Sequence, residues 1–332
     1  MRMNKLYKTI NGILKKAKGL LIRIASPLFI PIIKHIANSG DGTDKCLKHG
    51  YLPVAVHYYQ PIPDISELEK RKVWDKVGSM RGIRFEPLKY VEFLNQLSQK
   101  YAAECDWPNE RSSDPSQFYL NNGSFSYGCA APLHCIIRKN KPKKIIEIGS
   151  GNSSKIIAEA LRLNLLENFE TDYTIIDPYS VLDVLHFPQH TTITKEPVEL
   201  VSIDVFESLE EDDILFIDSS HTCKIGSDVN YEILEILPRL KKGVFVHFHD
   251  IPLPYEYPKI YATNPKFRVF WTESYLLQAF MTCNSDFDIV LPMAYLQKRC
   301  LDVLKQAFPC SQKAEFGWES GSFWIVRVAT TK

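Results

Sequence analysis

Lys144-Ile-Ile-Glu-Ile-Gly-Ser-Gly-Asn-Ser-Ser154 is the stretch that decides the fold of this chain. Residues 145–148 predict a short buried strand, Gly149 and Gly151 predict a tight turn, and the apolar spacing over 153–166 predicts a helix. A strand, a glycine turn and a helix N-terminus together are typical of a cofactor pocket. Glycine lets the backbone approach a ligand closely, and the free N–H groups of the first helical turn favour a carboxylate or phosphate.

The type of cofactor follows from the residues around the turn. A dinucleotide fingerprint needs a third glycine where this chain has Ser154, so a pyrophosphate is not favoured. The strand glutamate, Glu147, is suited to a cationic ligand. An E-x-G-x-G turn resembles the first motif of class I S-adenosylmethionine-dependent methyltransferases, whose cofactor carries a sulfonium, an amine and a carboxylate. We therefore expect Glu147, Gly149, Ser150 and Gly151 to line a cofactor site. The alternative is an ordinary strand-to-helix turn.

Downstream of residue 142 the pattern alternates between strands and helices, which predicts an α/β fold with a mostly parallel sheet covered on both faces. The clearest helix is expected after residue 227, ending at Gly243, with Ser227 or Asp228 as its cap. The predicted strands are 144–148, 173–176, 191–195, 213–217, 243–248, 287–292 and 322–328.

Polar residues follow several of these strands, at the edge where open α/β sheets bind ligands. Asp177 follows the second strand, and its carboxylate is expected to accept from the two hydroxyls of a ribose; a helix cap is the alternative. Asp218 and His221 follow the fourth strand, and His249 and Asp250 follow the fifth. A carboxylate–imidazole group of this kind predicts a general base, or a site for a divalent ion.

Longer segments carry a resemblance to a known family. They are Asp213 to Thr222, Gly226 to Asn230 and Leu237 to Asp250, together with His57 to Asp64, Asn122 to Gly128, Glu256 to Pro258, Trp271 to Phe280 and Gly321 to Trp324. These segments resemble bacterial class I methyltransferases of the methyltransferase-24 type, which are often encoded with polysaccharide genes. The resemblance covers about residues 55–328.

The resemblance implies a Rossmann-like seven-stranded sheet with an antiparallel last strand, and S-adenosylmethionine as cofactor. Glu147, Gly149, Gly151 and Asp177 match the family's cofactor motifs, with Asp218 beside them. Related sugar and macrolide methyltransferases hold magnesium on one acid after the fourth strand and two after the fifth. Asp218, His249 and Asp250 occupy these positions here. His249 replaces one of these acids, so two alternatives stay open. One is a metal-free base, His221 or His249. The other is a divalent ion, magnesium or manganese.

Composition gives the organisation of the chain. The 332 residues have 45% apolar and 24% charged content, which is typical of a soluble protein. Residues 1–50 form a basic arm, 51–140 a helical cap region and 141–332 the cofactor-binding domain. The eight cysteines have no metal-like spacing and predict reduced thiols. The first 40 residues carry eight basic and no acidic side chains, so the remaining 292 carry −7 (+1 minus +8), which argues against a nucleic-acid partner.

The arm itself contains an apolar stretch from Gly19 to Ala37 that Arg23, Pro27, Pro31 and Lys34 interrupt. The interruptions argue against a spanning helix. No small-residue cleavage site follows cleanly, which argues against a signal peptide. The interruptions are compatible with peripheral membrane contact through residues 1–37, or with an arm that packs on the body.

These observations predict a cytoplasmic S-adenosylmethionine-dependent methyltransferase, located near the inner face of the membrane, that methylates a hydroxyl of a saccharide or glycolipid. Tyr255 and Tyr257 are expected near the site mouth, where they would suit a sugar ring. A hydroxylase or hydrolase on the same fold, and a membrane-associated scaffold that keeps the pocket without catalysis, are the alternatives. The oligomeric state and the exact acceptor do not follow from the sequence.

Overall fold

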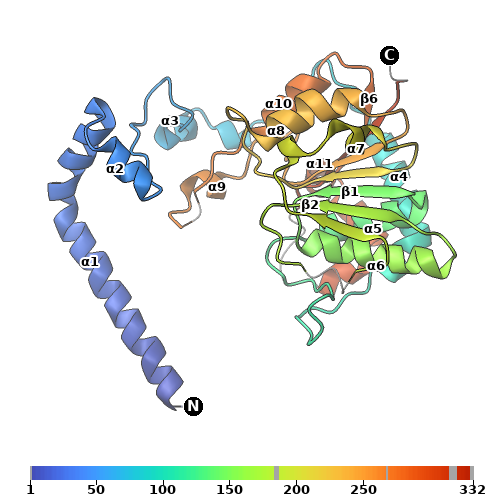
Figure 1. The fold of residues 1–332 in the computed structure, drawn as a ribbon, viewed down its shortest axis with the longest axis horizontal. Coiled ribbons are helices and arrows are strands. Elements are labelled where there is room, and N and C mark those ends of the chain that lie inside the picture. The colour runs from blue at the N-terminus through green and yellow to red at the C-terminus, as the bar shows by residue number, and fades with distance from the viewer. Residues whose placement is uncertain (1, 183–186, 267, 314–319, 330–332) are drawn as a thin grey trace. The chain divides into compact units, whose positions relative to one another are not determined.

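The computed structural model describes residues 2–182, 187–266, 268–313 and 320–329. The chain forms two compact units, Met1–Arg71 and Lys72–Lys332, and each is taken by itself. The first unit contains α1 (Arg2–Ser39), α2 (Thr43–Lys48) and α3 (Ile65–Lys70) (Figure 1). Gly40 and Gly42, with φ of 81° and 79°, break the chain between α1 and α2. By length and composition, Lys15–Ser39 is a helix that could cross a membrane.

The second unit is built on a seven-stranded sheet of order β3-β2-β1-β4-β5-β7-β6. Its strands are β1 (Lys144–Ile148), β2 (Asp172–Ile176), β3 (Thr191–Thr194), β4 (Ile214–Ile217), β5 (Phe245–Phe248), β6 (Phe287–Pro292) and β7 (Phe323–Arg327). The pairs from β3 across to β5 are parallel, whereas β7 lies antiparallel between β5 and β6. The predicted fold class is confirmed, including the antiparallel last strand.

Helices cover both faces of this sheet. One group packs together as α4 (Pro87–Tyr101), α5 (Tyr127–Asn140) and α6 (Asn152–Leu166), and the other contains α7 (Ile203–Glu207), α8 (Asp228–Tyr231) and α10 (Glu273–Met281). Figure 1 shows the strands between these two groups. The remaining helices are α9 (Lys259–Thr263), α11 (Met293–Arg299) and α12 (Leu301–Ala307), with short 3-10 turns at Val73–Asp75, Ala102–Glu104, Val198–Leu200 and Pro309–Lys313. Both α4 and α5 belong to the same compact unit as the sheet. The domain boundaries predicted at residues 50 and 140 stay predictions.

The core lies between the helices and the central strands. All four side chains of β4 and the residues Ile145, Ile146 and Ile148 of β1 are buried, as expected for parallel strands covered on both faces. The thiols of Cys105 and Cys135 lie 3.9 Å apart in this core and are not bonded; the cysteines whose side chains are described are all free.

The helix expected after Ser227 begins where predicted, since the Ser227 hydroxyl accepts from the amide of Asn230. It is not regular, however. After Tyr231 it widens into a π-helical stretch, Glu232–Ile236, and then tightens into a 3-10 turn, Leu237–Arg239. Pro238 has no N–H to continue the α-helical ladder, which explains the change of winding.

Candidate active site

The glycine turn ties the ends of three strands together at one edge of the sheet. The amide of Gly149 donates to the carbonyl of Ile176 at the end of β2, and the amide of Asp218 donates to the carbonyl of Ile148 at the end of β1. Gly149 has φ of 82°, and a Cβ there would lie 2.0 Å from the Asp218 carbonyl oxygen, so only glycine fits. A Cβ on Gly151 would meet nothing within 4 Å, so open space lies beside this residue at the start of α6.

Glu147 has a different role from the one expected. Its side chain is fully buried, and it accepts hydrogen bonds from the hydroxyls of Ser153 (2.7 Å), Ser154 (2.8 Å) and Tyr173. Burial raises the pKa of Glu147 to about 7, although the three hydroxyl donors oppose the shift. Its carboxylate therefore holds the first turn of α6 against β1 and β2 and has no exposed surface.

Asp177 lies at the end of β2, half-buried, beside the glycine turn. One carboxylate oxygen accepts from the Ser150 hydroxyl and the other from the amide of Tyr179 at 2.8 Å. These contacts bring Ser150 and Asp177 together, as expected for residues of one cofactor site. Each carboxylate oxygen can still accept a further hydrogen bond.

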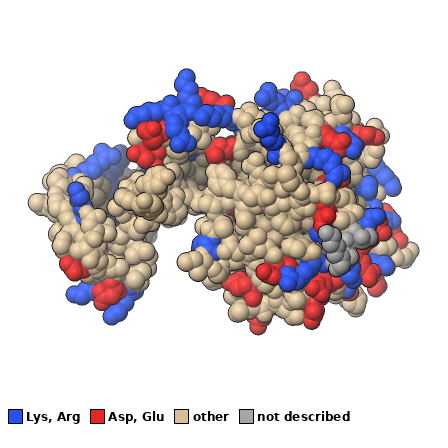
Figure 2. Space-filling view, turned by 90° about the horizontal axis from the view of Figure 1, so that it is seen from above, with Lys and Arg blue, Asp and Glu red and all other residues tan. Residues whose placement is uncertain are grey.

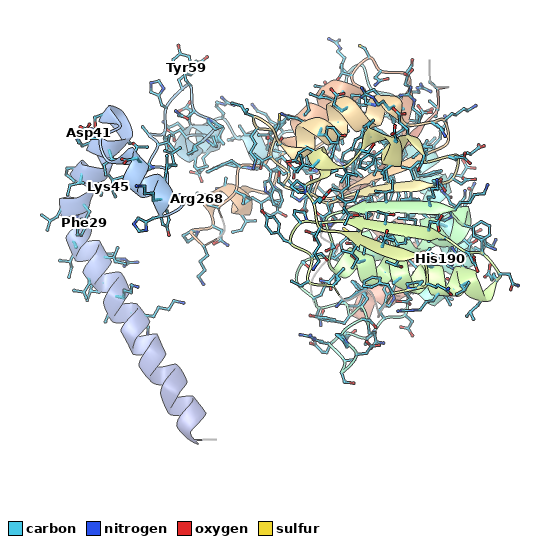
Figure 3. The ribbon with its side chains drawn as sticks, in the orientation of Figure 1. Phe29, Asp41, Lys45, Tyr59, His190 and Arg268 are labelled. Carbon is cyan, nitrogen blue, oxygen red and sulfur yellow. The ribbon has the colours of Figure 1, made fainter. Side chains whose placement is uncertain are left out.

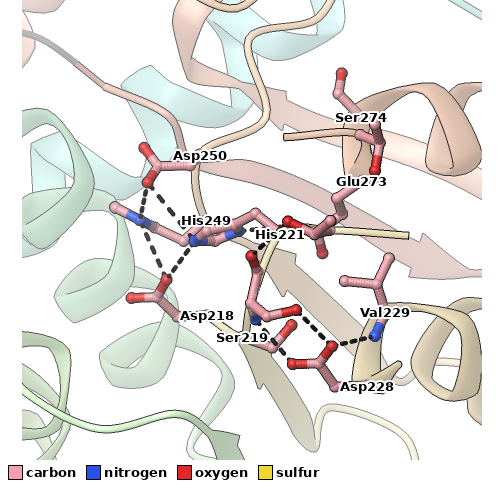
Figure 4. Close-up of polar contacts among 12 residues, drawn as sticks. Asp218, Ser219, His221, Asp228, Val229, His249, Asp250, Glu273 and Ser274 are labelled. Carbon is pink, nitrogen blue, oxygen red and sulfur yellow. Dashed lines mark hydrogen bonds and ion pairs between the residues drawn. The ribbon is translucent and has the colours of Figure 1, made fainter. Parts of the chain in front are cut away.

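Four side chains from two strand ends converge next to this turn, and we call them the acid–histidine cluster: Asp218, His221, His249 and Asp250 (Figure 4). His221 Nε2 lies 3.3 Å from an Asp218 oxygen and 3.7 Å from an Asp250 oxygen, and His249 Nδ1 lies 3.5 Å from each of the same two oxygens. The two imidazoles are buried, while the Asp218 and Asp250 side chains are 30% and 23% exposed. The carboxylates are thus the members that solvent or a substrate reaches most easily. The predicted convergence is confirmed.

A fifth residue, Glu273 at the start of α10, completes this arrangement, and the sequence analysis missed it. Its buried carboxylate lies 2.8 Å from His221 Nδ1. The amides of Thr272 and Glu273 both donate to the carbonyl of His221, at 2.9 and 3.1 Å. His221 is thereby held on both backbone and ring, with φ of 57°, and its Nε2 is aimed at Asp218 and Asp250. Glu273 is 52 residues from His221 in sequence, so no local pattern indicates the contact.

Three carboxylates around two imidazoles make the cluster attract positive charge. Burial alone would lower the pKa of His221, but Asp218 and Glu273 outweigh it and raise the pKa to about 10. The pKa of His249 is likewise raised well above its usual range by Asp218 and Asp250, against the effect of burial. In return, His249 and His221 hold the pKa of Asp218 well below its ordinary value, although burial opposes this.

The far side of His249 is closed by two further residues that the sequence did not indicate. The Phe125 ring stacks on the imidazole at 5.1 Å between centroids. Cys129 is buried nearby, with its thiol 3.4 Å from the Ser320 hydroxyl. Burial would raise the pKa of this thiol, but the positive charge of His249 lowers it to about 6. His247, by contrast, belongs to the core: it is fully buried, stacks on Phe216 and lies 2.9 Å from the Ser322 hydroxyl.

Among the residues that the structure describes, no group of three or more His, Cys, Asp and Glu side chains could hold a metal ion as the side chains lie. The donors themselves decide which ion they suit. Magnesium prefers oxygen ligands alone, whereas two carboxylates with an imidazole suit manganese or another borderline ion better. If the cluster held an ion, Asp218, His249 and Asp250 together would suit manganese better than magnesium.

The expected aromatic wall is mostly structural. The Lys298 ammonium lies 4.0 Å from the centre of the Tyr255 ring, and the Tyr257 hydroxyl accepts from the amide of Ser274, with Tyr257 only 8% exposed. Trp271 instead lies against the cluster, 4.4 Å from the His221 ring. A cavity of about 350 Å³ lies at the opposite edge of the sheet, where Lys144 and Asp172 begin their strands.

Comparison with known proteins decides the family. Residues 146–251 match the model of a methyltransferase domain family. An uncharacterized protein of Archaeoglobus fulgidus is 30% identical over 169 residues, which are 47% of this chain and 72% of that protein. This chain carries a methyltransferase domain. It belongs to one family with the archaeal protein, and the match confirms the predicted class, whose methyl donor is S-adenosylmethionine.

Three solved structures similar to the methyltransferase are distant from it. The apo structure of CmcI-N160 has 17% identity and a TM-score of 0.37, and covers 70% of this chain and 84% of that chain. The SAH-bound methyltransferase PaMTH1 of Podospora anserina has 14% identity and a TM-score of 0.35, over 84% and 100% of the two chains. A structure described as cmcI-D160 Mg-SAM has 18% identity and a TM-score of 0.34, over 68% and 86%. At these scores nothing about the site is carried over.

Proposed function

We propose that this methyltransferase transfers the methyl group of S-adenosylmethionine to a hydroxyl of a saccharide or glycolipid, inside the cell. The observation that carries the proposal is the acid–histidine cluster, because it lies at the same sheet edge as the glycine turn. Asp218 belongs to both places: its backbone packs on Gly149, and its side chain belongs to the cluster. A methyl donor at the turn would then lie next to groups that can handle the proton of an acceptor.

The donor site is assigned to the turn and the strand end beside it. The ribose hydroxyls would donate to Asp177, and the carboxylate of the amino-acid part would face the N-terminus of α6, next to the open space at Gly151. Gly149 and Ser150 shape this turn, and Glu147 supports it from behind. Asp218, which is 30% exposed, provides a negative charge toward the sulfonium.

The proton of the acceptor is assigned to His221. The neutral form of His221, whose share rises as pH approaches its pKa of about 10, keeps its N–H on Nδ1 next to Glu273 and presents the Nε2 lone pair on the side of Asp218 and Asp250. Activity should therefore rise with pH toward that pKa. The acceptor oxygen attacks the methyl carbon, the S–CH₃ electron pair stays on sulfur, and the hydroxyl proton passes to Nε2. The Asp250 carboxylate stabilises the imidazolium that forms. Glu273 acts only through His221 and is a positioning residue.

A divalent ion is assigned to Asp218, His249 and Asp250. When bound, it would lower the pKa of an acceptor hydroxyl. Because this ligand set includes a nitrogen, we expect activity to fall after treatment with a chelator and to recover better with manganese than with magnesium. Activity that a chelator leaves unchanged would assign the reaction to His221 alone.

The experiment that tests the function is a transfer assay. Purified protein is incubated with S-adenosylmethionine labelled in its methyl group and a panel of sugars and glycolipids, and oxygen uptake is followed in parallel. We expect alkali-stable label on an acceptor hydroxyl and no oxygen uptake. Oxygen uptake without labelled product would instead favour the hydroxylase alternative. Asp250→Ala should abolish transfer, while calorimetry shows unchanged donor affinity.

A further inference from the structure

The N-terminal helix α1 has two unlike faces. Polar or small residues recur along it every three or four positions as Lys16, Gly19, Arg23, Ser26 and Lys34, with Ile30 the one apolar member of the row. At 100° per residue these positions share one side of the helix. In the sequence the same step continues upstream through Lys5, Lys8 and Gly12.

The opposite side of α1 is a continuous apolar row. Its members are Leu21, Ile24, Leu28 and Ile32, again three and four residues apart, and their side chains are 66%, 67%, 74% and 56% exposed. Phe29 flanks this row and projects from the helix in Figure 3. None of the window that could cross a membrane is buried in the structure. An exposed apolar row of this length needs a partner surface.

Charge identifies the partner. All eight ionisable side chains of residues 1–40 other than histidine and tyrosine are basic, whereas on the face of the second unit shown in Figure 2 the two signs are interspersed. The polar row contains Lys16, Arg23 and Lys34, and we call it the basic row. A basic row on one side of a helix and an apolar row on the other complement an anionic lipid surface. We propose that α1 lies in the plane of an anionic membrane, with the apolar row in the lipid and the basic row toward the headgroups.

Lying in the plane fits the residues better than crossing. Between Lys18 and Lys34 there are 15 residues, or about 22 Å of helix, against about 30 Å of hydrocarbon, and Arg23 and two prolines fall inside this stretch. The charges flanking a crossing helix would hold the N-terminus inside, since residues 1–18 contain six Lys and Arg and 40–60 contain two. The catalytic unit would then lie outside, away from its intracellular methyl donor. This last step alone rests on the proposed function.

The test is co-sedimentation of the full chain with vesicles of phosphatidylcholine, alone or mixed with phosphatidylglycerol. We expect binding to the mixed vesicles that weakens as salt is raised. Leu21→Gln with Leu28→Gln and Ile32→Gln should lower the bound fraction by about tenfold or more. The matched control changes three equally exposed leucines elsewhere, Leu88→Gln, Leu166→Gln and Leu200→Gln, and should bind as the parent does.

A second pair of variants tests the charges. Lys16→Gln with Arg23→Gln and Lys34→Gln should remove the preference for anionic lipid, whereas Lys45→Gln with Lys48→Gln and Lys70→Gln, with the same change in net charge, should keep it. Failure of the parent to bind mixed vesicles, or equal binding by the apolar-row variant, would overturn the proposal. Resistance of the cellular protein to alkaline carbonate extraction would also overturn it, because it indicates a helix that crosses the membrane. A dimer that forms without lipid, and that the apolar-row substitutions dissociate, would overturn it as well. The affinity for S-adenosylmethionine, measured by calorimetry, should be the same in all of these variants. A failure of the membrane proposal can therefore be told apart from a failure of the proposed function.

Discussion

At the scale of single residues, Glu273 gives the sharpest test of the chemistry. Glu273→Gln keeps the size of the side chain but removes the charge that fixes the proton of His221 on Nδ1. We expect kcat to fall by about 10²-fold or more, with donor affinity and the KM for the acceptor nearly unchanged. Glu273→Asp should recover part of the loss. A loss of thermal stability of equal size in both variants, with no difference between them in kcat, would make Glu273 merely structural.

Glu147 gives a second residue-scale prediction, for stability. Its pKa is raised from 4.5 to about 7 in the folded state, so its contribution to stability is fully present below pH 4.5 and is lost as pH rises through 7. The difference corresponds to about 3 kcal/mol between pH 4 and pH 8. Urea unfolding at several pH values should show this decline in the parent protein and not in Glu147→Gln. If the unfolding free energies of the parent and of Glu147→Gln changed with pH in the same way, the pKa of Glu147 would not be raised by burial.

The role of Glu147 also shows what a motif can and cannot predict. The motif places this acidic residue in the strand before the glycine turn, where it does lie, but its contacts with Ser153, Ser154 and Tyr173 depend on how α6 and β2 pack on β1. Glu273, Phe125 and Cys129 reach the acid–histidine cluster from distant parts of the chain. Nothing in local sequence spacing encodes such contacts, so only the residues at strand ends could be predicted.

At the scale of elements, the two glycines of the turn should behave differently. Gly149→Ala drives a Cβ into the Asp218 carbonyl and should destabilise the protein by at least about 2 kcal/mol, measured by urea unfolding. Gly151→Ala meets open space and should leave unfolding nearly unchanged while it weakens donor binding. Unchanged donor affinity in Gly151→Ala would mean that the donor does not approach the start of α6.

The strands were predicted to within two residues at each end, because buried parallel strands are nearly continuous apolar runs bounded by polar residues. The helix after Ser227 was predicted by its apolar face, and Val229, Ile233, Ile236, Leu237 and Leu240 are indeed all buried. Its change of winding before Pro238 was not predicted. The apolar periodicity of a sequence predicts which face of a helix is buried more reliably than it predicts the hydrogen-bonding pattern of that helix.

At the scale of the whole molecule, the sequence predicted a basic arm over residues 1–50, a helical cap region over 51–140 and a cofactor-binding domain over 141–332. The structure divides into Met1–Arg71 and Lys72–Lys332, and the three predicted parts stay predictions. The central claim for the molecule is that a sulfonium nucleoside binds at the edge where β1, β2 and β4 end.

Calorimetry of the purified full chain with S-adenosylmethionine tests that claim most directly. We expect one site per chain in the parent protein and in Asp250→Ala, and no detectable binding in Asp177→Ala at the same protein concentration, with all three proteins unfolding at similar temperatures. Binding that is absent from the parent protein, or that Asp177→Ala leaves unchanged, would contradict the account.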